Sequence, residues 1–230
     1  MRRFLREQSL SLAFLALFLA ALAGQAYAGW HDYNNVETWH AQMAHEMPQT
    51  IGFGRYLTTS SFAQAVTENW QSEYLQFTLF ILLTVWLVQK GSPESKRPGE
   101  EGGESDEQQY VGVHAKPESP SWAKVRGLKL TLYSNSLVVV MAVIWVWSWF
   151  AQSVSGWSEH NADLLEHEQP SLSWVGYLGS ADFWQTTLQN WQSEFLAVGS
   201  MAVLSIYLRR RGSPESKPVG CPHEATSVEG

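Results

Sequence analysis

The sequence is poor in cysteine: it contains one, Cys221, among 230 residues. A single cysteine cannot form an intramolecular disulfide, a CxxC redox pair or a metal site made of several thiolates. Thiol-oxidising four-helix membrane enzymes, which need pairs of cysteines, are therefore excluded. The chain also lacks a phosphate-binding loop, a nucleophile elbow and a zinc-protease motif. We therefore expect a protein that is not an enzyme and that has no cofactor and no catalytic residue.

Charge is missing from four stretches, although the mean hydropathy of the whole chain is that of a soluble protein. No Asp, Glu, Lys or Arg occurs in residues 8–31, 74–89, 130–158 and 195–208. A transmembrane helix needs about 20 apolar residues. The first and third stretches reach that length, and the second and fourth are short by a few residues. Several of the 12 tryptophans lie at the ends of these stretches, where the membrane interface favours them. The pattern predicts an all-α membrane protein with four transmembrane helices.

Two segments of the sequence occur twice, 121 residues apart. Each copy contains the pentapeptide Asn-Trp-Gln-Ser-Glu, at 69–73 and 190–194, and the hexapeptide Gly-Ser-Pro-Glu-Ser-Lys, at 91–96 and 212–217. Weaker matches precede them at an offset of 127, including Gly29-Trp30 with Gly156-Trp157. These matches indicate tandem duplication of a two-helix unit. Two such units in the same orientation predict a pseudo-twofold axis along the membrane normal.

The repeats divide the chain into four parts. Repeat 1 covers residues 1–97, with an outer loop at about 30–60, and repeat 2 covers residues 126–217, with an outer loop at about 157–181. Between them, residues 98–125 are rich in Gly, Glu, Ser and Pro, which predicts a disordered linker, and residues 218–230 form a similar tail. In each hexapeptide the glycine follows a basic residue and precedes Ser-Pro. This order is typical of a helix stop, an interpretation we favour over a partner-binding motif.

The N-terminal stretch also imitates a secretory signal, with Arg2 and Arg3 before an apolar run and Ala26-Tyr27-Ala28 after it. The same unit recurs in mid-chain at residues 135–155, where a signal peptide cannot be. We therefore expect the first helix to be a structural member, with cleavage as the less favoured alternative.

Positive charge is distributed unevenly. Of the 15 Lys and Arg residues, all but Arg55 fall at the N-terminus, in the linker region or after the last helix. The positive-inside rule places these segments in the cytoplasm, and therefore both termini. The net charge of −7 is spread over polar loops and predicts no nucleic-acid partner.

The two pentapeptides predict a polar site near the outer ends of the second and fourth helices. An acidic side chain inside a membrane is costly and normally faces protein or a wet cavity. Glutamines near the outer ends of the first and third helices are expected at a similar depth, where they could hydrogen-bond to the pentapeptide side chains. The candidate intramembrane cluster comprises Gln25, Asn69, Gln71, Ser72, Glu73, Gln152, Asn190, Gln192, Ser193 and Glu194. We favour a packing role for it, because polar groups hold membrane helices together. A proton-linked or cation-conducting site, or another binding site, is the alternative.

The outer loops contain several histidines. His160 and Asp163, with Glu166, His167 and Glu168, suggest a divalent-cation site. However, the histidines do not recur at matched positions in the two repeats. We therefore favour solvated loop residues and expect no metal site. No histidine lies well inside an apolar stretch, which argues against a haem held by two histidines.

The motifs resemble a known family. Residues 4–10, Phe-Leu-Arg-Glu-Gln-Ser-Leu, together with the two pentapeptides and the two hexapeptides, are similar to a bacterial family of small integral membrane proteins classed as a domain of unknown function. The resemblance covers roughly residues 2–97 and 126–217. It implies the bacterial cytoplasmic (inner) membrane as the location and brings no activity, cofactor or catalytic residue.

Two hypotheses follow for the function. The first is a non-enzymatic structural or accessory component of the bacterial envelope, embedded in the lipid bilayer, with a membrane-protein partner or a second copy of itself. The alternative is a small transporter or channel for protons or cations that uses Glu73 and Glu194. A water-filled cavity that reaches both glutamates would favour transport, and a dry, hydrogen-bonded cluster would favour structure.

Overall fold

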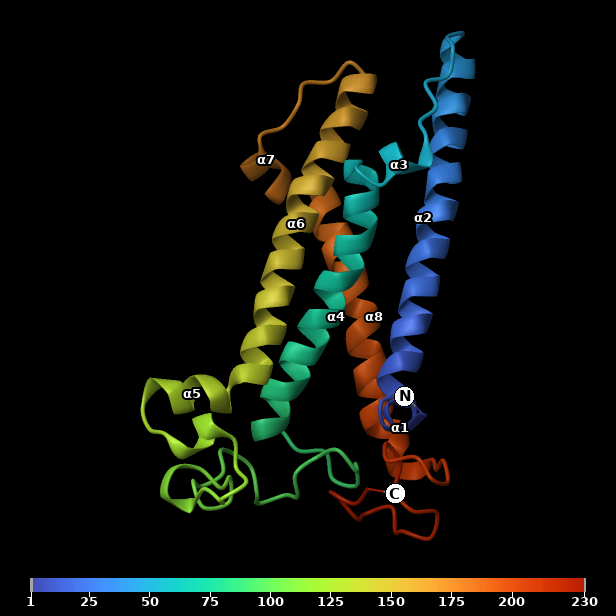
Figure 1. The fold of residues 1–230 in the computed structure, drawn as a ribbon. Coiled ribbons are helices and arrows are strands. Elements are labelled where there is room, and N and C mark those ends of the chain that lie inside the picture. The colour runs from blue at the N-terminus through green and yellow to red at the C-terminus, as the bar shows by residue number, and fades with distance from the viewer. Residues whose placement is uncertain (1, 230) are drawn as a thin grey trace. The chain divides into compact units, whose positions relative to one another are not determined.

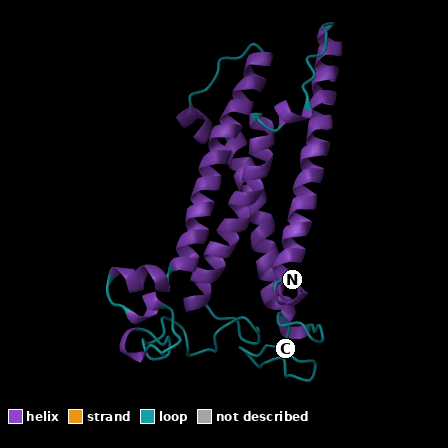
Figure 2. Ribbon diagram, viewed as in Figure 1, coloured by secondary structure: helices purple, strands orange, loops and turns teal. Residues whose placement is uncertain are grey.

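The computed structural model describes residues 2–229, and in this part of the chain every regular element is a helix (Figures 1 and 2). Four helices are long: α2 (Ser9–Ala44), α4 (Ser60–Trp86), α6 (Ser136–Glu166) and α8 (Ala181–Tyr207). Short helices precede them: α1 (Arg2–Glu7), α3 (Phe53–Tyr56), α5 (Leu128–Ser134) and α7 (Trp174–Leu178). The linker contains two 3-10 turns, η1 (Gly112–His114) and η2 (Ser121–Lys124). The expected all-helical fold is confirmed.

Of the four expected membrane helices, two qualify among the described residues. Helices α2 and α6 each contain an 18-residue window that is long and apolar enough to cross a membrane. Such a window is weak evidence taken alone, because a signal sequence or a buried core helix also contains one. Helices α4 and α8 do not qualify, and the pentapeptides explain why: each places polar side chains in the middle of its helix. Of the four helices expected to span, two are therefore candidates by length and composition, not four.

The long helices do not end where the sequence predicts. Helices α2 and α6 continue to Ala44 and Glu166, through the first part of the segments expected to be outer loops. Helices α4 and α8 end at Trp86 and Tyr207, five residues before the stop glycines. At the end of α8 the Arg209 guanidinium donates to the carbonyls of Ser205, Ile206 and Leu208, at 3.1, 3.0 and 2.8 Å. The basic residue, rather than the glycine, satisfies the last turn.

The chain divides into two compact units. Unit 1 comprises residues 1–66 and 155–170, and unit 2 comprises residues 67–154 and 171–230. Unit 1 thus contains α2, α3, the first turns of α4 and the last turns of α6.

Unit 2 is held together by aromatic rings. The Trp149 ring lies between 5.8 and 6.1 Å from the rings of Trp145, Phe183, Trp184 and Trp191. Aromatic pairs at such distances stabilise a core beyond their buried area.

Candidate functional site: an acidic pocket in unit 1

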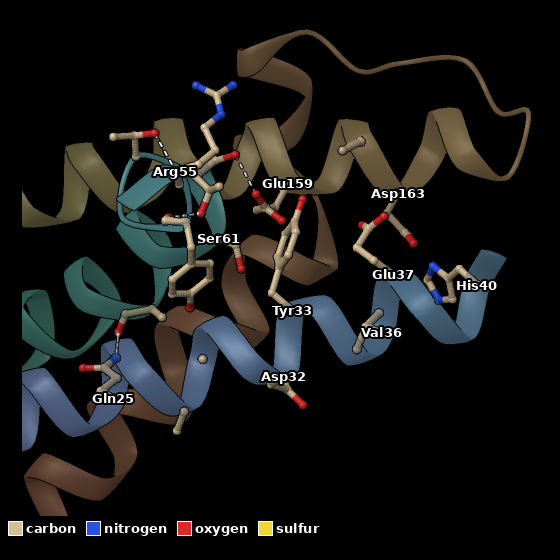
Figure 3. A pocket seen from close by; sticks show the side chains of 18 of the residues that line it. Gln25, Asp32, Tyr33, Val36, Glu37, His40, Arg55, Ser61, Glu159 and Asp163 are labelled. Carbon is tan, nitrogen blue, oxygen red and sulfur yellow. Dashed lines mark hydrogen bonds between the residues drawn. The ribbon is translucent and has the colours of Figure 1, made fainter. Parts of the chain in front are cut away.

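A cavity of about 1080 Å³ lies within unit 1 (Figure 3). Helix α2 forms one wall and the end of α6 forms another, with α3 and the start of α4 closing the side. We call it the acidic pocket, because five carboxylates line it: Asp32, Glu37, Glu159, Asp163 and Glu166. The cations that accompany them are one guanidinium, from Arg55, and the imidazole of His40 when it is protonated.

Helical spacing accounts for the two walls. Tyr33, Glu37 and His40 follow one another at intervals of four and three residues on α2, and Glu159, Asp163 and Glu166 repeat that spacing on α6. Residues at such intervals share one face of a helix. The two faces line the same cavity. Sequence analysis missed this site, although the repeated spacing was the signal that could have revealed it.

Two of the carboxylates have close partners across the pocket. The Ser60 hydroxyl donates a hydrogen bond of 2.6 Å to Glu159 Oε1. His40 Nδ1 lies 2.7 Å from Glu166 Oε1 and joins the walls formed by α2 and α6. These contacts connect residues that are 99 and 126 positions apart in the sequence, so local pattern alone could not reveal them.

Tyr56 forms the inner wall. Its side chain is buried, and its ring lies 5.9 Å from the ring of Tyr33 and 5.5 Å from that of Phe62. Gly29 permits the approach of this ring to α2, since a Cβ atom there would lie 2.2 Å from the Tyr56 hydroxyl oxygen. Burial raises the pKa of Tyr56, and the carboxylates of Asp32 and Glu159 raise it further, so the phenol stays neutral. Burial also raises the pKa of Tyr33, and Glu37 and Glu159 act in the same direction.

The segment that carries Tyr56 is attached to α2 by one asparagine. The Asn34 side-chain amide donates to Ile51 O at 3.0 Å and accepts from Ile51 N at 2.8 Å. Trp30 Nε1 donates to the same carbonyl oxygen at 2.7 Å. A side chain that satisfies both backbone groups of one residue holds the loop in a single register.

The structure brings part of the expected intramembrane cluster together in unit 2. Gln71 is completely buried, and its Oε1 accepts a hydrogen bond of 2.6 Å from Trp191 Nε1. Ser72 is buried as well, and Glu194 lies near enough to Ser72 and Glu73 to interact with both electrostatically. The two repeated glutamates are therefore neighbours.

The other members of the cluster have different surroundings. Asn190 donates to Thr186 O, and the hydroxyls of Ser72 and Ser193 donate to the carbonyls of Asn69 and Asn190. Gln192 is exposed although its repeat counterpart Gln71 is buried. Gln152 is buried in unit 2, whereas Gln25 belongs to unit 1 and donates to Ala65 O at 3.3 Å.

The two hexapeptides also meet in unit 2. The side chains of Glu94 and Glu215 are hydrogen-bonded to each other, beside a cavity of about 290 Å³. This hydrogen bond raises the pKa of Glu94 to about 7, and burial and the charges of Glu215 and Glu229 act in the same direction. Lys217 is buried, and its ammonium donates to the carbonyls of Gly91, His223 and Ala225 at 2.5, 2.8 and 3.0 Å. The hexapeptides thus make tertiary contacts beyond the ends of α4 and α8.

A metal ion finds no ready site in the described part of the chain. No three His, Cys, Asp or Glu side chains there are grouped closely enough to hold one. Of the residues that suggested a divalent-cation site, His167 and Asp163 lie at the exposed end of α6, with His167 Nδ1 3.5 Å from Asp163 Oδ1.

The comparisons with known proteins identify a family. No curated protein and no solved structure matches the chain. A family described as a domain of unknown function, DUF6766, matches residues 1–228. That span is nearly the whole chain, so the chain belongs to the DUF6766 family of proteins with a domain of unknown function.

Proposed function

We propose that the protein is a multi-pass integral membrane protein with four spanning helices, and that it acts as a non-enzymatic structural or accessory component of the bacterial envelope. One observation carries this proposal. Only 6% of the apolar window of α2 and 17% of that of α6 is buried within the protein. Side chains such as Leu10, Phe14 and Leu17 are more than half exposed. Apolar surface of this extent requires a nonaqueous surrounding.

Helices α4 and α8 join the bundle in this proposal. Each has 27 residues and is therefore roughly 40 Å long, more than a hydrocarbon core of about 30 Å. Their second halves expose large apolar side chains, among them Phe77 and Leu83 of α4 and Leu196 and Leu204 of α8. In this arrangement the polar pentapeptides lie toward one leaflet, with Gln71 and Ser72 buried in protein.

The element boundaries support a duplicated two-helix unit. Helices α4 and α8 begin 121 residues apart and also end 121 residues apart. The same offset separates Tyr56, the last residue of α3, from the buried Tyr177 of α7. Helices α2 and α6 begin 127 residues apart, and the breaks before them have nearly equal dihedral angles: φ −112°, ψ 16° at Gln8 and φ −113°, ψ 9° at Asn135. Equal breaks at matched positions are expected of copies of one unit.

Membrane extraction tests the proposal. In washed membranes treated with alkaline carbonate and then with detergent, we expect the protein to stay in the pellet with carbonate and to be released by detergent. Release by carbonate would contradict an integral location. Co-purification in mild detergent would then show whether the partner is another membrane protein or a second copy.

A second candidate function is the movement of protons or cations by Glu73 and Glu194. The closeness of these two carboxylates favours it, because two acidic groups on neighbouring helices offer a place to hold a cation. The test is uptake into liposomes that contain a pH-sensitive dye. If the pair carries protons, Glu73→Gln and Glu194→Gln should each abolish the flux and leave folded protein abundant. Equal traces for empty and protein-containing liposomes would reject transport.

A further inference from the structure

A cavity of about 260 Å³ in unit 2 is walled by aromatic rings, and we call it the aromatic cavity. Helices α6 and α8 form two of its walls, and the short helix α7, which folds back beside α6, forms the third (Figure 1). Five of its eight lining residues are aromatic: Trp149, Phe150, Trp174, Phe183 and Trp184. Pockets for drug-sized molecules measure about 300–1,000 Å³, so a ligand of this cavity is small.

The rings stand at steep angles to one another. The Trp184 ring lies 6.1 Å from that of Trp149 and 5.5 Å from that of Phe183, at interplanar angles of 68° and 76°. The ring of Trp174, on α7, lies 5.9 Å from that of Phe150 at 75°. Rings in such different planes surround a cavity on several sides, which is the arrangement of an aromatic cage.

The polar groups of the lining already have partners within the protein. All three indole N–H groups donate to protein atoms: Trp149 to Thr187 Oγ1 at 3.4 Å, Trp174 to Ser153 Oγ at 3.2 Å and Trp184 to Leu178 O at 3.0 Å. The Ser153 hydroxyl in turn donates to Phe150 O at 2.7 Å. An indole has one donor and no acceptor, so these rings offer the cavity carbon surface. A ligand that depends on hydrogen bonds would lose them on entering, and a ligand that makes none would not.

The charged residues of the walls are of one sign. Residues 130–154 and 171–208, which contain every lining residue, include two carboxylates, Asp182 and Glu194, and no lysine or arginine. Asp182 directly precedes Phe183 of the cavity wall. A cleft surrounded by charge of one sign attracts ions of the opposite sign. The charge therefore favours a cation as the ligand.

The first repeat lacks most of these rings. At the offsets of 127 and 121 residues, three of the five aromatic residues correspond to smaller aliphatic ones: Trp149 to Leu22, Phe150 to Ala23 and Trp184 to Ala63. Tryptophans that only anchor helices at the membrane interface would be expected in both units alike. The additional rings are therefore particular to the second unit, and a binding site there accounts for them.

We propose that the aromatic cavity binds a small quaternary ammonium cation, with a trimethylammonium head between the rings. Such a head has no N–H group and therefore needs no hydrogen bond, and its charge is attracted by aromatic faces. A protonated primary amine would instead leave its N–H groups without partners. This binding goes beyond the proposed structural role and does not depend on the number of spanning helices.

The test is calorimetric titration of the full chain, in an uncharged maltoside detergent, with choline and with its carbon analogue, a neutral dimethylbutanol of the same shape. We expect choline to bind at least tenfold more tightly than the analogue, because the rings attract the charged head only. This comparison uses the wild-type chain, so it holds whether or not a variant folds. Equal or tighter binding of the neutral analogue would show that the cavity takes hydrocarbon, and it would overturn the proposal.

Variants then locate the binding. Trp184→Leu removes a ring that is 40% exposed and keeps an apolar side chain, and Trp184→Phe keeps a smaller ring. The control is Trp147→Leu, at a 57% exposed position of α6 outside the cavity. We expect Trp184→Leu to weaken choline binding at least tenfold, Trp184→Phe to weaken it less, and Trp147→Leu to change it less than twofold. The proposal is also overturned if the wild-type protein gives no heat with millimolar choline, or if the two leucine variants weaken binding equally.

Discussion

Replacement of Gly29 by alanine tests the packing that forms the acidic pocket. A Cβ atom at this position would lie 2.2 Å from the hydroxyl oxygen of Tyr56 and 3.1 Å from its Cζ. The ring cannot easily move aside, since it is buried between Tyr33 and Phe62. Overpacking of this kind typically costs about 1–3 kcal/mol.

Gly24→Ala is the matched control on the same helix, because nothing lies within 4 Å of a Cβ atom there. Both variants gain the higher helix propensity of alanine, roughly 1 kcal/mol, so their difference isolates the contact with Tyr56. We expect Gly29→Ala to be less stable than Gly24→Ala by about 1–3 kcal/mol. Thermal unfolding in detergent, followed by circular dichroism, measures this difference. Equal unfolding temperatures for the two variants would refute the close approach of Tyr56 to α2.

Two further predictions concern the attached loop and the joined hexapeptides. Asn34→Ala removes both hydrogen bonds to Ile51 and should cost about 1–2 kcal/mol of stability, whereas Asn35→Ala, on the exposed side of α2, should be nearly neutral; equal losses in thermal unfolding would contradict the attachment. The pKa of Glu94 is raised from 4.5 to about 7, so the folded state binds a proton that the unfolded state has already lost. The contribution of Glu94 to the free energy of unfolding is therefore full below about pH 4.5 and is lost as the pH rises through 7. Because the Glu94 side chain is exposed and solvent screens its charge, we expect this contribution to be only about 1 kcal/mol. The stability difference between wild type and Glu94→Gln should change by that amount between pH 5 and pH 8, and a constant difference would rule out the shared proton with Glu215.

Some of the fold could be predicted from the sequence because local patterns determine it. The absence of charge in residues 8–31 and 130–158 predicted two long apolar helices, and α2 and α6 are there. The ends of the helices were harder to predict. A glycine before Ser-Pro is a strong local stop signal, but in α8 the Arg209 side chain satisfies the last carbonyls earlier.

The site depends on contacts between distant segments, which no local pattern contains. The pentapeptides are identical, yet Gln71 is buried and bonded to Trp191, whereas Gln192 is exposed. Identical sequence therefore does not mean an identical environment, because the neighbouring helices differ. For the same reason the sequence did not relate Glu37 to Asp163, which helices α2 and α6 place on facing walls.

The topology of the chain tests the central claim, that all four long helices cross the membrane. Because Cys221 is the single cysteine, Cys221→Ser provides a background into which Gln42→Cys, Gly103→Cys and Leu165→Cys can each be introduced. Intact cells and inverted vesicles are then treated with a maleimide that cannot cross the bilayer. We predict that Gln42→Cys and Leu165→Cys react only in intact cells, and that Gly103→Cys and the native Cys221 react only in inverted vesicles. Reaction of Gly103→Cys in intact cells would show that α4 does not cross, and it would contradict the four-span account.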